Sequence, residues 1–357
     1  MKRRDFIIKG TAGALTAGAA GCGAAGSKKM EFKPGPAPFS FKVDMPKPSG
    51  TMPVGEIGIT GIKVSKLGFG SHIRKEIIKY FEERQKIIRE SYDLGVTFFD
   101  VYDMEMECYQ YEPMGKHLAP MINDVVISIS IAPYDGRSFE QEFERDLRVF
   151  GRDHIDMVRI HSGNPDDPRW EKLFKLKEKG HIRAVGMPIH DPESLNKLLG
   201  VIPLDYVIFP YNFYHNVCWY GEKPDDFNPL VEELRKRNIG VVTMKPFAGD
   251  WLVTPFKKLA EQFSGKSGIR FPQAALKYII NSEIDADTTL AGMYNLNHVY
   301  ENTASYYNSR ITDEEIKLLD KLRDVADKRT QAWLPDHYKW MGKWAPSPHD
   351  ERNNDTA

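Results

Sequence analysis

The sequence predicts an α/β protein folded as a (β/α)8 TIM barrel with an N-terminal β-hairpin. Eight short runs of apolar residues, many of them β-branched or aromatic, alternate with longer amphipathic stretches. Runs that are apolar throughout are typical of parallel strands buried on both faces, and eight of them alternating with helices favour a closed barrel. The alternative is an open doubly wound sheet. No Gly-x-Gly-x-x-Gly motif follows the first predicted strand, so a dinucleotide site of the open-sheet type is unsupported.

The elements follow one another regularly from residue 54 onwards. A short hairpin is expected over residues 53–63, ahead of the first strand. The eight strands are expected at Val64–Phe69, Val96–Val101, Val125–Ile131, Ile155–Ile160, Ile182–Met187, Tyr206–Phe209, Gly240–Met244 and Thr288–Ala291. Amphipathic helices are expected at 75–93, 138–150, 168–180, 227–238 and 271–281, several of them ending at a glycine: Gly95, Gly180 and Gly240. A final helix is expected to begin at Thr312, where Glu315 completes a capping box.

Composition excludes several classes of protein. The 357 residues carry 49 Lys and Arg against 50 Asp and Glu, so the basic excess of a general nucleic-acid binder is missing. Three cysteines are too few for a disulfide framework or a four-cysteine zinc or iron–sulfur site. No apolar run approaches the ~18 residues of a membrane-spanning helix. We therefore expect a soluble protein of enzymatic size without a nucleic-acid partner.

The first fifty residues differ from the rest. Arg3 and Arg4 precede a weakly apolar Gly/Ala-rich stretch, a layout that looks like a twin-arginine export signal over residues 1–26; a disordered basic tail is the alternative. The signal ends at Cys22, which resembles a lipoprotein processing site, although ordinary cleavage nearby would also fit. We expect export through the twin-arginine machinery to the periplasm or to the outer side of the cytoplasmic membrane.

The remaining chain divides into three parts. Residues 27–53 are proline-rich and suit an extended linker, residues 54–330 form the barrel, and residues 331–357 are a polar tail. In such a barrel the chemistry belongs at the carboxyl ends of the strands. The polar residues expected there are His72, Asp100, Tyr102, Ser130, His161, His190, Asn212 and Lys245. Asp100 and His161 are the most informative, because each directly ends a very apolar run and so faces the mouth from a dry core.

These strand ends resemble the aldo-keto reductase family over residues 54–330. The matching stretches are Lys63–Gly70, Leu94–Asp100, Met114–Leu118, His154–His161, Gly180–Gly186, Tyr211–Asn212, and Gly292–Met293 followed by Glu301–Asn302. Members of the family transfer a hydride from a nicotinamide cofactor to an aldehyde or ketone. A tyrosine donates the proton, assisted by a lysine, a histidine and an aspartate.

The resemblance implies an incomplete catalytic set. Asp100 and His161 match the family aspartate and histidine, but Ser130 stands where the family has its lysine. No lysine lies between Lys116 and Lys172, so the sequence predicts a site without a buried cation.

The proton donor is also displaced in the sequence. The family tyrosine position is Glu105 here, and the loop over residues 101–113 is longer than in the family. Tyr109 is the expected replacement, with Tyr102 and Tyr111 as alternatives.

The cofactor contacts are only partly kept. The expected cofactor is NADP or NAD, held tightly if it is bound at all, and its expected ligands are Asn212, Lys245, Glu301 and Asn302, the last two at the adenine. Positions that in the family contact the nicotinamide hold side chains that lack the family's contacts: Pro188, Ile189, Ile208 and Met244. At the position of the basic residues that usually bind the adenosine 2′-phosphate, the chain has Gly292-Met293-Tyr294 and His298.

Three functional hypotheses follow. The first is an NAD(P)H-dependent reductase of a carbonyl or sugar-like substrate. The second is a non-catalytic exported barrel that binds a small molecule or a partner, for which the mouth loops offer aromatic side chains: Tyr211, Tyr214, Trp219, Tyr220 and Trp251. The third uses Asp100, Glu105 and His161 as acid–base groups without nicotinamide. A metal held by Glu105, Glu107 and His161 is disfavoured, because no His-x-His or similar ligand spacing is present.

Overall fold

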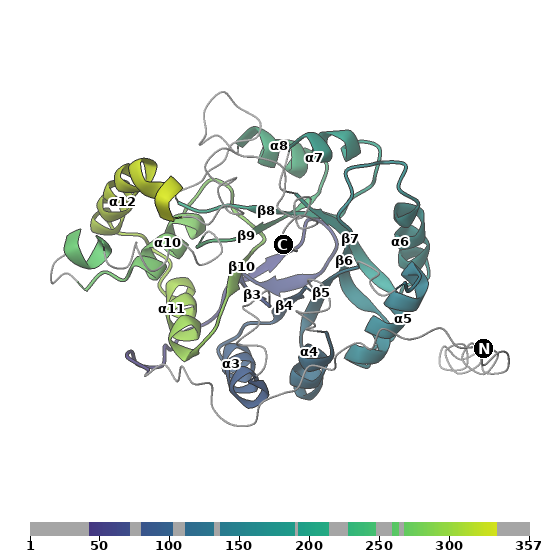
Figure 1. Ribbon diagram of the computed structural model, residues 1–357, viewed down its shortest axis with the longest axis horizontal. Coiled ribbons are helices and arrows are strands. Elements are labelled where there is room, and N and C mark those ends of the chain that lie inside the picture. Colours follow the sequence, from purple (N-terminus) through teal and green to yellow (C-terminus); the bar gives the residue numbers. More distant parts are fainter. Residues whose placement is uncertain are drawn as a thin grey trace. The chain divides into compact units, whose positions relative to one another are not determined.

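A computed structural model of the chain describes residues 43–71, 80–102, 111–131, 136–189, 192–213, 228–247, 259–263 and 268–333. Eight parallel strands close a barrel in the order β10-β3-β4-β5-β6-β7-β8-β9, with helices around the outside (Figure 1). The predicted (β/α)8 TIM barrel is confirmed, and each of the eight apolar runs overlaps one barrel strand. Within the described part of the chain, no helix is both long and apolar enough to span a membrane.

The bounds of the elements agree closely with the expected ranges. The barrel strands are β3 (Leu67–Gly70), β4 (Phe98–Val101), β5 (Val126–Ser130), β6 (Ile155–Arg159), β7 (Ile182–Pro188), β8 (Tyr206–Pro210), β9 (Gly240–Met244) and β10 (Thr288–Gly292). The helices are α3 (Phe81–Asp93), α4 (Tyr111–Leu118), α5 (Phe139–Phe150), α6 (Pro168–Glu178), α7 (Pro192–Leu198), α8 (Asn228–Lys236), α10 (Phe271–Ile280), α11 (Leu296–Tyr307) and α12 (Asp313–Trp333), with a 3-10 turn η1 (Ala119–Met121). The capping box of α12 is confirmed, because the Thr312 hydroxyl accepts from the Glu315 amide and the Glu315 carboxylate accepts from the Thr312 amide.

The predicted first strand divides into two. Its first half, β2 (Lys63–Ser65), pairs antiparallel with β1 (Val54–Glu56) and completes the predicted hairpin. Its second half, β3, turns away after Lys66 and pairs with β4 and β10 in the barrel. One apolar run therefore serves two sheets, and periodicity alone does not reveal the bend.

The hairpin closes the amino-terminal end of the barrel. Ile57, Ile62 and Val64 are fully buried and join an apolar cluster with the inward side chains of the strands. The inward residues of this layer are Phe98, Met157, Ala184, Tyr206, Ile208, Val242 and Leu290. The barrel interior below the mouth is therefore a packed apolar core, which excludes water from beneath the side chains at the mouth.

Gly240 has a different role from the predicted one. It is the first residue of β9, and the end of α8 is made instead by Asn238, whose φ of 60° is left-handed. A Cβ on Gly240 would lie 2.8 Å from Ile57 Cγ2 and 2.9 Å from the Gly58 amide nitrogen, so the glycine lets the hairpin approach the barrel. Gly95 and Gly180, with φ of 85° and 76°, follow α3 and α6 as predicted.

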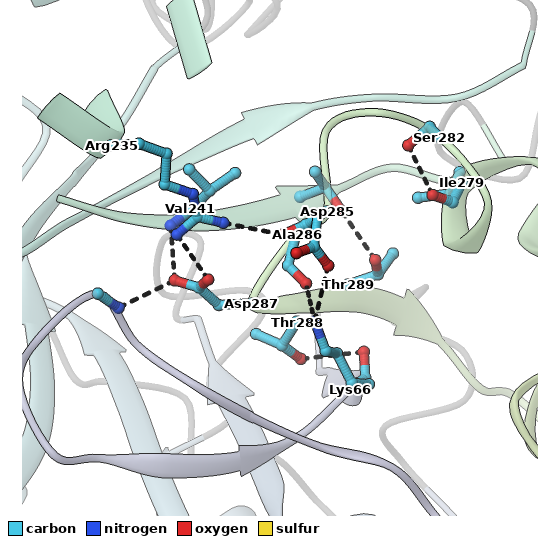
Figure 2. A network of polar contacts seen from close by, with 12 residues as sticks. Lys66, Arg235, Val241, Ile279, Ser282, Asp285, Ala286, Asp287, Thr288 and Thr289 are labelled. Carbon is cyan, nitrogen blue, oxygen red and sulfur yellow. Dashed lines mark hydrogen bonds and ion pairs between the residues drawn. The ribbon is translucent and has the colours of Figure 1, made fainter. Parts of the chain in front are cut away.

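Three aspartates bind the hairpin and neighbouring strands together at the same end; we call them the floor carboxylates: Asp156 and Asp287, which are buried, and Asp205, which is half-buried. Figure 2 shows Asp287, which accepts from the amides of Val241 at 2.9 Å and Gly58 at 3.0 Å, and from Arg235 at 2.7 Å. Beside it, Lys66 donates to the Ala286 carbonyl at 2.8 Å across the β3–β10 seam. The carboxylate thus joins β9, β10 and the hairpin.

The other two floor carboxylates repeat the arrangement. Asp205 accepts from the amide of Val185 on β7 at 2.7 Å. Asp156 accepts from the amide of Ile127 on β5 at 3.0 Å, and from Arg152 and Arg183 at 2.8 and 2.7 Å. Each aspartate lies at or before the start of one strand and satisfies a backbone donor of the preceding one, with a cation beside it.

Residues 43–53, the last part of the segment expected as a linker, lie against the barrel; we call them the N-terminal strap. The Asp44 amide donates to the Asn297 side chain of α11 at 3.0 Å, and Lys47 pairs with Glu90 of α3 at 2.7 Å. Met52 is buried beside Gly95, at the end of α3. The strap therefore crosses α3 and α11, the helices that follow β3 and β10, the two strands whose pairing closes the barrel.

Candidate active site

Polar side chains gather in the barrel interior at the carboxyl ends of β4, β5 and β6. Asp100 comes from β4, Ser128 from β5 and Arg159 from β6, and all three are buried. They stand one layer above the apolar interior, where enzymes with this fold place their reacting groups. Asp100 and His161, both predicted from sequence, belong to this end of the barrel.

Arg159 and Asp100 form a bidentate ion pair. The Nη1–Oδ1 distance is 2.5 Å and the Nη2–Oδ2 distance is 3.1 Å, while Nη1 also donates to Ser128 Oγ at 2.7 Å. Arg159 is 3% exposed and Asp100 is 7% exposed. Burial alone would lower the pKa of Arg159, but the charge and hydrogen bonds of Asp100 outweigh it, so the pKa is raised above its ordinary value.

The prediction of a site without a buried cation is therefore wrong. The resemblance places a lysine at Ser130 on β5, whereas the cation here is Arg159 on the next strand, β6. Ser130 and Arg159 are register partners. The pattern of β6 contains the signal, because Met157, Arg159 and His161 alternate with outward residues. A charged residue at an inward position of an otherwise apolar strand needs a buried counter-ion, and Asp100 provides it.

Tyr102 lies beside this pair. Its ring centroid is 5.6 Å from that of His161, and the Arg159 Cζ is 5.8 Å from the Tyr102 centroid. Its backbone amide donates to Ser71 Oγ at 3.2 Å, which fixes the chain just after β4. Phenol, imidazole and guanidinium are thus neighbours at the mouth.

The other tyrosines are placed differently. The Tyr111 hydroxyl donates to the Ser130 carbonyl at 2.6 Å and is buried, so it serves α4–β5 packing and not the mouth. Tyr206 lies inside the barrel, where burial raises the pKa of its phenol far above the ordinary value despite the nearby Arg159. Tyr109 and Glu105 lie outside the described residues, as do other sequence candidates: His72, Glu107, His190, Tyr214, Trp219, Tyr220 and Trp251.

No cluster of three or more His, Cys, Asp or Glu side chains suited to a metal ion occurs among the residues that the structure describes.

Two of the expected cofactor ligands, Asn212 and Lys245, are close together in the fold. The Asn212 side chain, after β8, donates to the Lys245 carbonyl, after β9, at 3.2 Å. Lys245 has a left-handed φ of 56° and marks a sharp turn at this edge of the mouth. Pro188, the last residue of β7, is the register partner of Ile208 in the middle of β8, and the Ile189 amide donates to the Ile208 carbonyl at 2.8 Å. The side chains of Pro188 and Ile208 are buried and apolar.

The residues expected at the adenine end lie on α11. Glu301 is buried and pairs with Arg270 Nε at 2.5 Å, and Arg270 also pairs with Asp44 of the strap at 3.1 Å. Asn302 is 1% exposed, and its Nδ2 has no hydrogen-bond partner among the described residues. A buried amide donor without a partner costs about 1–3 kcal/mol, which a bound acceptor would remove.

Comparison with known proteins agrees with this architecture. The model of the aldo/keto reductase family matches residues 66–324. L-galactose dehydrogenase of Arabidopsis thaliana is 24% identical over 281 residues, which cover 70% of this chain and 86% of that protein. L-glyceraldehyde 3-phosphate reductase of Escherichia coli O157:H7 is 20% identical over 351 residues, 81% of this chain and 96% of that protein. The holo form of aldo-keto reductase AKR11C1 from Bacillus halodurans superposes with a TM-score of 0.61 at 21% identity, covering 76% of this chain and 96% of that chain.

Proposed function

Because the chain belongs to the aldo/keto reductase family of oxidoreductases, we propose that it reduces a carbonyl or sugar-like substrate with NADH or NADPH. The observation that carries the proposal is the grouping of Asp100, Arg159, His161 and Tyr102 at the barrel mouth. Two relatives are named for sugar or sugar-phosphate substrates, which supports that substrate class.

The adenine end fits a nucleotide. Asn302 offers a buried amide donor without a partner, and Glu301 lies beside it as an acceptor. Asn212 and Lys245 would contact the nicotinamide end, where the walls at Pro188 and Ile208 are apolar. The cofactor, when bound, supplies the hydride.

The protein's own groups would handle the oxygen and the proton. His161 would donate a hydrogen bond to the carbonyl oxygen, and a tyrosine would donate the proton. Tyr102 is our preferred donor because it lies beside His161; Tyr109, the donor expected from sequence, is the competing assignment.

The decisive test is a titration of the purified protein with NADH and NADPH, followed by Trp and cofactor fluorescence. We expect saturable binding, and turnover with short sugar aldehydes that falls by about 10²-fold or more in His161→Ala while binding persists. Absence of binding up to millimolar concentration, with no nucleotide copurifying, would contradict the proposal and favour a non-catalytic barrel.

The charges around Arg270 predict a cofactor preference. Arg270 already balances one of two carboxylates, Glu301 and Asp44, which leaves a net negative charge near the expected adenosine. A 2′-phosphate adds about −2 charge, so we expect NADH to bind at least as tightly as NADPH. In Asp44→Asn, NADPH binding should improve several-fold relative to NADH, and an unchanged ratio would argue against this placement.

We also propose that the protein is exported by the twin-arginine machinery and anchored through a lipid on Cys22. The support is the Arg3-Arg4 pair and the small residues before Cys22. Fractionation should find the protein outside the cytoplasm, with Arg3→Lys/Arg4→Lys retained inside. Cys22→Ala should release it from the membrane, and membrane association that persists in this variant would count against lipidation.

A further inference from the structure

We infer that Arg159 is the positioning cation of the active site, acting from β6 on Asp100 and on the phenol of Tyr102. The inference rests on the proposed reductase function, but it concerns groups that are observable without turnover. We assign to Arg159 on β6 the electrostatic role that the family gives to a lysine, whose position on β5 is Ser130 here.

The geometry holds the guanidinium in one place. Two of its donors face Asp100 and one of them also reaches Ser128, so the plane of the group is fixed by β4 and β5. Planar forks of this kind are pre-organised for carboxylates, which lysine ammonium groups are not. The positive charge of Arg159 therefore lies at a defined position just below the mouth of the barrel.

Tyr102 receives the effect of this charge. The Arg159 Cζ lies 5.8 Å from its ring centroid, and the His161 ring centroid lies 5.6 Å from it. Among the described residues, Arg159 itself interacts with Asp100 and Tyr206. A cation at this range favours the phenolate over the phenol. Because arginine keeps its proton throughout the working pH range, the support does not switch off as pH rises.

In the proposed step, the carbonyl carbon gains a hydride from the reduced nicotinamide, which becomes oxidised. The Tyr102 O–H bond breaks and the carbonyl oxygen takes the proton, so the product is an alcohol. The phenolate left on Tyr102 beside Arg159 regains a proton from water. Arg159 neither gains nor loses a proton in this step, which is why we call it a positioning residue.

Ser130 allows a relocation experiment. Its hydroxyl oxygen has no hydrogen-bond partner among the described residues, and it is the register partner of Arg159. A lysine introduced there would point into the barrel beside the vacated position, since Ser128 and Ser130 share the inward face. The set to compare is wild type, Arg159→Met, Arg159→Lys and the double variant Arg159→Met/Ser130→Lys.

The readouts are the pH profile of kcat and the titration of tyrosine by NMR with isotope-labelled tyrosine, assigned with Tyr102→Phe. In Arg159→Met we expect kcat to fall about 10²-fold or more, and the Tyr102 phenol to titrate about one pH unit or more higher. Ser130→Lys in the double variant should recover part of both effects. If Arg159→Met does not fold, Arg159→Lys supplies the comparison. Because lysine keeps the positive charge at neutral pH, the Tyr102 phenol in this variant should titrate within about half a pH unit of its wild-type value.

An unchanged Tyr102 titration in a folded Arg159→Met protein would overturn the inference. So would an unchanged pH profile, or a Tyr102→Phe variant with full activity. If the titration shifts as expected but wild type reduces no carbonyl, the inference about Arg159 stands and the proposed function fails.

Discussion

Replacing Asp100 with alanine is expected to destabilise the fold by about 3–5 kcal/mol. The change removes the counter-ion of a guanidinium that is 3% exposed and bonded to Asp100 through two nitrogen atoms. Within the described part of the chain, the hydrogen bond to Ser128 Oγ would remain as the side-chain contact of a buried and otherwise unpaired guanidinium. Urea denaturation measures the loss directly.

The matched control removes both charges. In Asp100→Leu/Arg159→Met the buried pair gives way to apolar side chains of similar length, so most of the lost stability should return. This double variant should fold yet remain inactive, which separates the structural from the catalytic contribution of the pair. A single variant costing less than about 1 kcal/mol would show that the guanidinium is hydrated in solution.

The second large effect concerns the floor carboxylate Asp156. Burial alone would raise its pKa, but the nearby His154, the charges and hydrogen bonds of Arg152 and Arg183, and the hydrogen bond from the Ile127 amide outweigh this and lower the pKa to about 2. In the unfolded chain this carboxyl has its ordinary pKa of 3.8. The difference between the unfolded and folded pKa corresponds to about 2–3 kcal/mol of folding stability at neutral pH, which Asp156→Asn should remove.

The pKa of Asp156 is lower in the folded protein than in the unfolded chain, and this direction determines how stability depends on pH. A depressed folded-state pKa contributes stability that is fully present above the unfolded pKa and is lost as pH falls through the folded one. Wild type should therefore lose this contribution between about pH 4 and pH 2, while Asp156→Asn should show a flatter acid branch. Asp166→Asn, at an exposed aspartate, is the control and should leave both the stability and the curve unchanged.

The barrel could be predicted because its signal is local. Each strand is a run such as Ile155–Arg159 whose residues are buried on both faces, and such runs are visible without any knowledge of neighbours. The bend at Lys66 could not be predicted, because there the Lys66 amide donates to the Pro53 carbonyl, a contact between residues distant in sequence that the apolar pattern does not reveal.

The site shows the same boundary. Asp100 and His161 can be predicted because each ends an apolar run, whereas the role of Arg159 depends on a partner 59 residues away, which the local pattern does not reveal. The prolines of the strap predict a linker because they favour an extended chain. An extended chain can still pack, and here Met52 and Asp44 make contacts that composition does not encode.

The strap and hairpin have a consequence for the order of folding. Their partners are among the last parts of the domain to be synthesised: Asp44 meets Asn297 across 253 residues, Gly58 meets Asp287 across 229, and Lys66 meets Ala286 across 220. Such contacts form slowly, since a long loop must close before any of them is gained. The nascent chain therefore cannot complete its barrel until the ribosome has released β10, and until then the growing sheet has an open edge at β3.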